Sequence, residues 1–146
     1  MRRTAKFAHS VGAIGLTGGI AAQLVVLTFL PEPTSLETYA QLRLAMNGIA
    51  EWIILPSLVI VLLSGLWSMA ISPAFHNAGW VWLKLASGIL VFKGTLFSIL
   101  SPARREAERS IAALAGELEV DQLGQSLGEE WGVLWVILAI AIANVV

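Results

Sequence analysis

The stretch WIILPSLVIVLLSGLWSMAI, Trp52–Ile71, decides the fold class of this chain. Its 20 residues carry no formal charge, and a helix needs about 20 apolar residues to cross the hydrocarbon core of a bilayer. The stretch lacks the strict alternation of polar and apolar residues that a membrane β-strand shows, and it is about twice as long as such a strand. It therefore predicts a transmembrane helix.

Three further stretches resemble this one in composition. Phe7–Leu30 has 24 residues without a charge, and Trp80–Leu100 has 21 residues that include Lys84 and Lys93. Trp131–Val146 has only 16 residues, so the fourth helix is expected to begin slightly earlier, near residue 128. The chain is expected to form a single membrane domain, residues 1–146, with spans at about 7–30, 52–71, 80–100 and 128–146.

The composition of the whole chain agrees with this prediction. Hydrophobic residues make up 57% of the 146 residues and charged residues 13%, which excludes both an ordinary soluble domain and a disordered chain. The net charge of −1 argues against a nucleic-acid-binding protein. The absence of cysteine excludes disulfides, zinc–thiolate sites and iron–sulfur clusters. We expect an all-α integral membrane four-helix bundle whose partner is the lipid bilayer.

The connections between the spans differ in character. Pro31–Arg43 is rich in turn-forming residues and is expected to be a surface loop. The connector of residues 101–127 is polar, but Ser101 followed by Pro102 is a typical helix start. Apolar residues then recur at helical spacing against a charged face, which predicts an amphipathic helix at the membrane surface between the third and fourth spans. Such a helix either contacts a partner or lipid, or only connects the spans.

Antiparallel packing fixes the relative depth of the ionisable residues. The first and third spans both start on the side that holds the N-terminus, and His9 and Lys84 lie two and four residues beyond the span starts at Phe7 and Trp80. Both side chains are therefore expected at a similar depth, about one helical turn inside the membrane. Outside the spans, three basic residues fall on the N-terminal side and four on the other, so the positive-inside rule leaves the orientation open.

Small residues mark the protein-facing side of the first span. His9, Gly12 and Gly19 fall along one helical stripe, and Gly15 forms a GxxxG pair with Gly19. Small residues at such spacing permit close packing of membrane helices. We therefore expect the Gly12/Gly19 face to pack closely against a neighbouring helix.

The third span carries two lysines on different faces. Lys84 shares a face with Ser87 and Gly88, whereas Lys93 is close to half a turn out of phase with Lys84. Lys93 is therefore expected outside any site formed by Lys84. It either snorkels to the headgroups or pairs with Glu51.

Ionisable groups inside a bilayer are costly and are functional candidates by default. An imidazole in a helical bundle suits an axial ligand of haem iron. His9 is thus the candidate metal ligand and Lys84 the candidate partner of a haem propionate, with Trp67 and Trp82 covering the ring edge. A copper or zinc site is less well supported, because it would need His9 and the loop residue His76 together with weak ligands.

Three motifs, in order, carry a family resemblance. The first span opens with KFAH ending at His9, the second has Pro56 followed by Gly65–Trp67, and the third opens with Gly79–Lys84, GWVWLK. This pattern resembles the four-helix membrane superfamily that includes HemJ-type protoporphyrinogen oxidases, CopD-type copper-resistance membrane domains and related predicted membrane proteins without assigned activity. The resemblance covers roughly the first 100 residues.

The resemblance implies roles for particular residues. His9 matches the first-helix histidine, a haem-ligand position, and Lys84 matches the third-helix lysine, while Pro56 and Trp80 match motif positions. The third helix of HemJ-type proteins usually reads Trp-x-His-x-Lys, and in this chain Trp82 stands in the middle position. The resemblance implies a protein of the bacterial cytoplasmic (inner) membrane with a b-type haem or porphyrin and an oxidoreductase-like role.

Two other classes of function remain open. The glycine-rich first helix, the short fourth span and the missing histidines favour a cofactor-free accessory or structural subunit of a larger membrane complex. A small metal-ion permease gated by His9 and Lys84 is a third class. A homo-oligomer and a larger complex are both compatible with the sequence.

Overall fold

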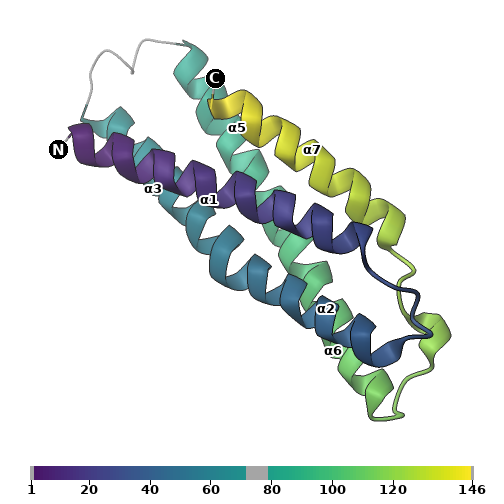
Figure 1. The fold of residues 1–146 in the computed structure, drawn as a ribbon. Helices are drawn as coiled ribbons and strands as arrows, with labels where there is room; N and C mark the ends of the chain where they lie inside the picture. The colour runs from purple at the N-terminus through teal and green to yellow at the C-terminus, as the bar shows by residue number, and fades with distance from the viewer. Residues whose placement is uncertain (1, 72–78, 146) are drawn as a thin grey trace.

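The computed structural model describes residues 2–71 and 79–145, and the regular structure of these residues is entirely helical. This confirms the predicted all-α bundle. In chain order the elements are α1 (Arg2–Thr28), α2 (Leu36–Ile49), the π-helical turn η1 (Ala50–Ile54), α3 (Leu55–Ala70), α5 (Gly79–Thr95), the π-helical turn η2 (Leu96–Leu100), α6 (Ser101–Leu114), the 3-10 turn η3 (Val120–Gln122) and α7 (Leu127–Val145) (Figure 1).

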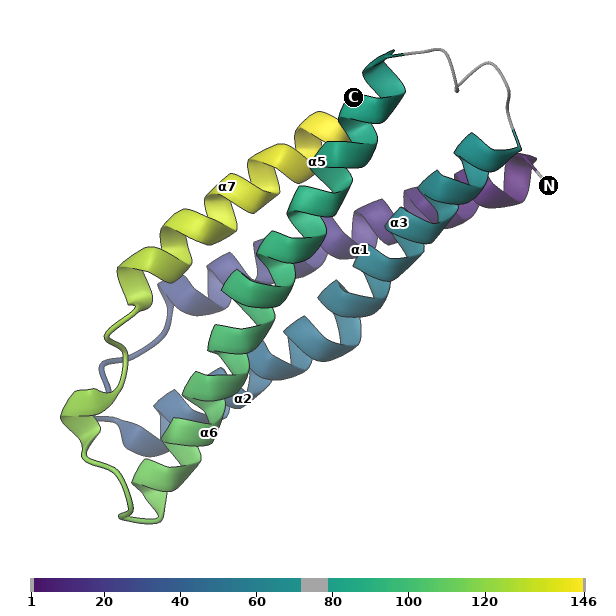
Figure 2. The same cartoon turned by 180° about the vertical axis from the view of Figure 1, so that it is seen from behind.

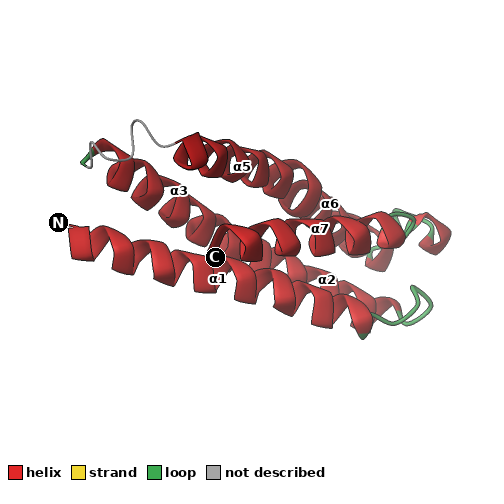
Figure 3. Ribbon diagram, turned by 90° about the horizontal axis from the view of Figure 1, so that it is seen from above, coloured by secondary structure: helices red, strands yellow, loops and turns green. Residues whose placement is uncertain are grey.

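Two of the bundle helices are long composite rods. The elements α2, η1 and α3 follow one another without a break, as do α5, η2 and α6 (Figure 2). In the bundle α1 packs against α3 and α7, and α5 packs against the same two helices (Figure 3). The start of α1 and the end of α7 lie toward the same end of the bundle, which we call the N-terminal end. At the opposite end, the connector end, α2 pairs with α6.

Four helices within residues 2–71 and 79–145 are long and apolar enough to cross a membrane, as an integral membrane protein requires. They overlap the expected spans to within two residues at the C-terminal end of the first, second and fourth, but two of them are much longer because each contains a whole composite rod. Their limits are Arg3–Thr28, Leu36–Ala70, Gly79–Leu114 and Val120–Asn144.

The segment predicted to be a surface loop, Pro31–Arg43, is helical from Leu36 onward. Tyr39, Arg43 and Met46 are buried at spacings of four and three residues, which is the repeat of one helical face. That face packs against α6. The loop prediction was wrong because the turn-forming residues end at the start of this repeat, and because its burial depends on a helix far away in the sequence.

The amphipathic helix expected after the third span is present as α6. It continues from α5 through η2 as part of the same rod, so it is not a separate helix between two spans. Its small face, with Ala107 and Ser110, is buried and packs against α2, whereas Arg104 and Arg109 are exposed. Packing against α2 thus fixes the direction of α6, and the connector that follows is short.

Glycines allow α1 to approach α3 very closely. A Cβ atom added at Gly12 would lie 2.9 Å from the carbonyl oxygen of Ser57, and one added at Gly19 would lie 2.7 Å from Cγ1 of Ile54. Gly15, between them, faces the side chain of Ser57. The close contact expected for this glycine face is therefore formed, and its partner is the rod of η1 and α3.

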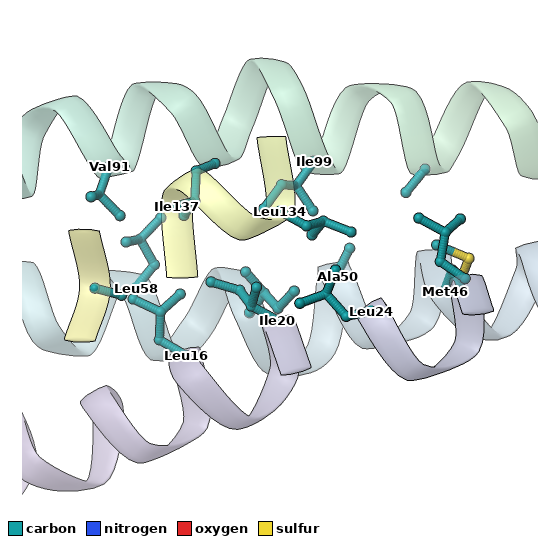
Figure 4. Packing of buried hydrophobic residues seen from close by; sticks show 14 residues of the cluster. Leu16, Ile20, Leu24, Met46, Ala50, Leu58, Val91, Ile99, Leu134 and Ile137 are labelled. Carbon is teal, nitrogen blue, oxygen red and sulfur yellow. The ribbon is translucent and has the colours of Figure 1, made fainter. Parts of the chain in front are cut away.

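A continuous apolar core joins the four long helices (Figure 4). Ile20 of α1 and Ile54 of η1 are completely buried within it. Its other buried members are Leu16, Leu24, Leu27, Met46, Ala50, Leu58, Val91, Ile99, Ala103, Leu134, Ile137 and Ala141.

A buried ion cluster holds the connector end together. The side chain of Arg43 is fully buried, and its Nη1 lies 2.7 Å from Oε2 of Glu130 on α7. Its Nη2 lies 3.9 Å from Oε2 of Glu106 on α6. The Tyr39 hydroxyl donates a hydrogen bond to the same Glu106 oxygen at 3.1 Å and accepts one from Nε of Arg43 at 3.1 Å. This cluster, which the sequence did not reveal, ties α2, α6 and α7 to one another.

The membrane assignment predicts which positions are accessible from water. The chain has no cysteine, so single cysteines introduced at Val59 and Ile89, both on the outer surface of the bundle, can be tested without background. Because both lie within apolar spans, we expect little labelling by a membrane-impermeant maleimide in vesicles. A cysteine at the exposed Glu117 should be labelled readily. Rapid labelling at Val59 or Ile89 contradicts the assignment.

Candidate ligand site between the two helix pairs

A cleft separates the α1–α3 pair from the α5–α7 pair toward the N-terminal end of the bundle. Its volume is about 210 Å³ and its walls are mainly apolar. We call it the His9 cleft. The residues that line it are His9, Ala13, Leu16 and Thr17 of α1, Leu58, Val61, Leu62, Gly65, Leu66, Ser68 and Met69 of α3, Trp80, Val81, Lys84, Leu85, Gly88 and Val91 of α5, and Ala141 and Asn144 of α7.

The imidazole ring of His9 is oriented by α3. Its Nδ1 lies 3.1 Å from the carbonyl oxygen of Val61 and 3.1 Å from Oγ of Ser64. Because a carbonyl oxygen only accepts hydrogen bonds, Nδ1 carries the proton and donates it. In the neutral ring Nε2 then holds the lone pair and is the nitrogen left for a ligand. Metal-bound histidines are commonly oriented by such a hydrogen bond from the other ring nitrogen.

The support for His9 is itself fixed within α3. The hydroxyl of the buried Ser64 donates to the carbonyl oxygen of Ile60 at 2.6 Å, so its lone pairs remain for the imidazole. Next to it, a Cβ atom added at Gly65 would lie 3.8 Å from Cε1 of His9, in contact with the ring. Ser64 is not among the site residues predicted from the sequence. Its position beside a glycine, within an otherwise apolar stretch, is the signal that could have revealed it.

Lys84 lines the same cleft from α5. Its Nζ donates a hydrogen bond to the carbonyl oxygen of Asn144 at 3.4 Å and lies 5.7 Å from the centre of the Trp80 ring. The Ser87 hydroxyl donates to Oδ1 of Asn144 at 2.8 Å, which joins α5 to the end of α7. The lysine side chain is exposed, so its ammonium group stands at the edge of the cleft.

The tryptophan at the cleft is not one of the two predicted from the sequence. Trp67 and Trp82 do not line the cavity, and each is 55% exposed. Trp80 lines it instead. Residues four apart on a helix share a face, whereas residues two apart do not. The spacing to Lys84 could therefore have distinguished Trp80 from Trp82.

Two further expectations concern ionisable residues outside the cleft. Lys93 is exposed and does not line the cavity, as its phase on the helix predicted. The pair suggested between Lys93 and Glu51 is not formed, since no ion pair joins these two described side chains. His76 lies outside the described residues.

The cleft thus combines one oriented imidazole, one ammonium group and apolar walls. In the part of the chain that the structure describes, no group of three or more histidine, aspartate or glutamate side chains is placed to hold a metal ion. A single imidazole suits a metal whose other ligands belong to a macrocycle, as in haem.

Comparison of the chain with protein-family models, curated proteins and solved structures found no match.

Proposed function

We propose that this membrane protein binds a b-type haem or a related metalloporphyrin in the His9 cleft, with Nε2 of His9 as the axial ligand. The observation that carries the proposal is the hydrogen bond from Nδ1 of His9 to the carbonyl oxygen of Val61. It assigns the proton to Nδ1, leaves Nε2 for the iron and restricts rotation of the ring. The order of motifs around His9 and Lys84, which resembles HemJ-type and CopD-type proteins, supports the same function in a bacterial cytoplasmic membrane.

The other residues of the cleft suit a porphyrin. The apolar side chains of the four helices would contact the macrocycle and exclude water from it, while Gly65 and Gly88 leave space at the walls. The exposed ammonium group of Lys84 would pair with a propionate. The volume of about 210 Å³ is below the roughly 300–1,000 Å³ typical of sites that enclose a ligand, so part of the macrocycle would extend beyond the cleft.

A bound haem would supply one-electron redox chemistry. The contribution of this chain would be to bind the group, to orient its axial ligand and to keep its surroundings apolar. An oxidoreductase-like role follows from the resemblance and forms part of the proposal.

Substitutions at the cleft test the proposal. We expect His9→Ala to remove most of the haem that copurifies with the protein, because the iron loses its axial bond. Lys84→Met should keep a wild-type-like spectrum but weaken haem retention, because one charge-assisted hydrogen bond, worth about 1.5–3 kcal/mol, is lost. The matched control is Lys93→Met, which removes an exposed lysine of the same helix that lies outside the cleft. Haem content per folded protein, measured by absorption, is the readout.

Several outcomes contradict the proposal. If His9→Ala retains the wild-type haem spectrum, His9 is not the ligand. If Lys93→Met loses as much haem as Lys84→Met, the propionate partner is misassigned. If wild-type protein made with supplied haem contains none and copurifies with other subunits, the accessory-subunit interpretation replaces this one. Metal-dependent uptake into vesicles by haem-free protein favours a permease instead.

A further inference from the structure

A second cavity lies on the flank of the two composite rods, where their π-helical turns meet. Its volume is about 560 Å³, and it is lined by Glu51, Trp52, Leu55, Leu96, Leu100, Ser101 and Arg104. We call it the η1–η2 groove. It shares no residue with the His9 cleft. The two cavities are therefore separate candidate sites.

Both walls of this groove depart from α-helical geometry. Glu51 and Trp52 belong to η1, and Leu96 and Leu100 belong to η2. Each π-helical turn is followed by a proline near the start of the next helix, at Pro56 and Pro102. Proline lacks the N–H that would bond the carbonyl four residues earlier, which accounts for a local widening of the helix. Although single π turns are rare in proteins, those that occur are often found at functional sites. In this chain two of them contact each other.

The change of composition along the rods indicates that the groove would lie near one surface of a membrane. On one side of it lie α2 and α6, which carry charged residues, and on the other lie the apolar α3 and α5. Trp52, at this junction, is 81% exposed, and tryptophan side chains concentrate at the level of the lipid headgroups. The groove therefore has an apolar part that would face acyl chains and a polar part at headgroup level.

The polar part of the groove contains two opposite charges. Arg104 forms an ion pair with Glu108 on the outer face of α6, with 2.9 Å between Nε and Oε1. The planar guanidinium group has five N–H donors, so further donors remain for an anion. Glu51 is exposed and interacts electrostatically with Arg104, but among the described residues its carboxylate forms no hydrogen bond and no direct ion pair. A guanidinium group that can bind an anion and a carboxylate that can bind a cation thus lie in one groove.

We infer that the η1–η2 groove binds a phospholipid whose headgroup carries a primary ammonium group. The phosphate would bind Arg104 and Ser101, the ammonium group would donate hydrogen bonds to Glu51, and the upper acyl chains would contact Leu55, Leu96 and Leu100. Phosphatidylethanolamine has this chemistry. A choline headgroup has a cation but no N–H to donate, and a glycerol headgroup has hydroxyl donors but no cation. Neither therefore offers Glu51 a hydrogen bond and an opposite charge together.

Native mass spectrometry of the detergent-solubilised protein tests this inference. The protein is mixed with equal amounts of phosphatidylethanolamine, phosphatidylcholine and phosphatidylglycerol of identical acyl chains, and the retained lipids are counted. We expect wild-type protein to retain phosphatidylethanolamine about three- to tenfold more than the other two, because the charge-assisted hydrogen bond to the exposed Glu51 is screened by solvent and is weaker than a buried one. Glu51→Gln should abolish this preference, and Arg104→Gln should lower retention of all three lipids. Glu117→Gln, which removes an exposed acid outside the groove, should change neither the preference for phosphatidylethanolamine nor the total lipid retained.

Three results would overturn the inference. Equal retention of the three lipids by wild-type protein means that only unspecific annular lipid is present. A preference that survives both groove substitutions means that the lipid binds elsewhere. A photoreactive residue can also be introduced at position 52. If it crosslinks in native membranes to a second copy or another subunit, and to no lipid, the groove is a protein interface.

Discussion

Replacing Gly12 with leucine is expected to prevent the bundle from folding. A Cβ at this position would lie 2.9 Å from the backbone oxygen of Ser57 and 2.9 Å from Cγ2 of Val61. A backbone oxygen cannot move aside as a flexible side chain can, so α1 and α3 must separate. The same separation would break the hydrogen bond from His9 to Val61. We expect a loss of about 3 kcal/mol or more in the free energy of unfolding.

Gly18 provides a matched control for this prediction. It lies on the exposed face of the same helix, and no atom lies within 4 Å of an added Cβ. Gly18→Leu adds the same side chain to α1 and is expected to leave folding unchanged. The yield of monodisperse protein and the thermal unfolding midpoint in detergent are the measurements. Equal values for Gly12→Leu and Gly18→Leu would show that α1 and α3 are not closely packed through this face.

Arg43→Met is expected to cause a comparable loss of stability at the opposite end of the bundle. The substitution retains the aliphatic part of the side chain but removes a fully buried cation. The buried carboxylates of Glu106 and Glu130 are then left without their shared partner. Breaking a buried ion pair by removing one member typically costs about 3–5 kcal/mol. Chemical or thermal unfolding in detergent measures this loss.

Two variants distinguish charge burial from a general loss of packing. Arg104→Met removes an exposed arginine that pairs with Glu108 at the surface, and surface pairs of this kind contribute little to stability. We expect it to unfold like the wild type. Adding Glu130→Gln to Arg43→Met should recover part of the lost stability, because one unpaired buried charge is removed as well. If Arg43→Met and Arg104→Met are equally stable, the buried cluster does not hold the connector end.

The arrangement of His9 and Lys84 illustrates how much of the candidate site could be predicted. Both lie near the start of a span on the same side, so counting residues along antiparallel helices places them at one depth, and both line one cleft. Counting cannot identify the support for His9. The carbonyl of Val61 and the hydroxyl of Ser64 are 52 and 55 residues away in the sequence, and only the packing of α1 on α3 brings them to the ring.

The connector end shows why part of the fold was not predictable. Arg43 falls in a segment that begins with turn-forming residues, and its strongest partner, Glu130, is 87 residues away. Local propensity gives little indication of a helix at the start of this segment, and no local pattern pairs a buried arginine with an acid on another helix. The helical repeat of Tyr39, Arg43 and Met46 becomes interpretable only once α6 is known to cover it.

Titration of haem into purified wild-type protein, followed by absorption in the Soret region, tests the central claim most directly. We expect saturable binding at one haem per chain, with a shifted Soret band that is absent in the folded His9→Ala variant, because in the proposed site His9 would supply the axial bond to the iron. Absorption that rises without saturation, and equally in wild-type protein and His9→Ala, would mean that haem only partitions into the detergent and that the cleft is not a haem site.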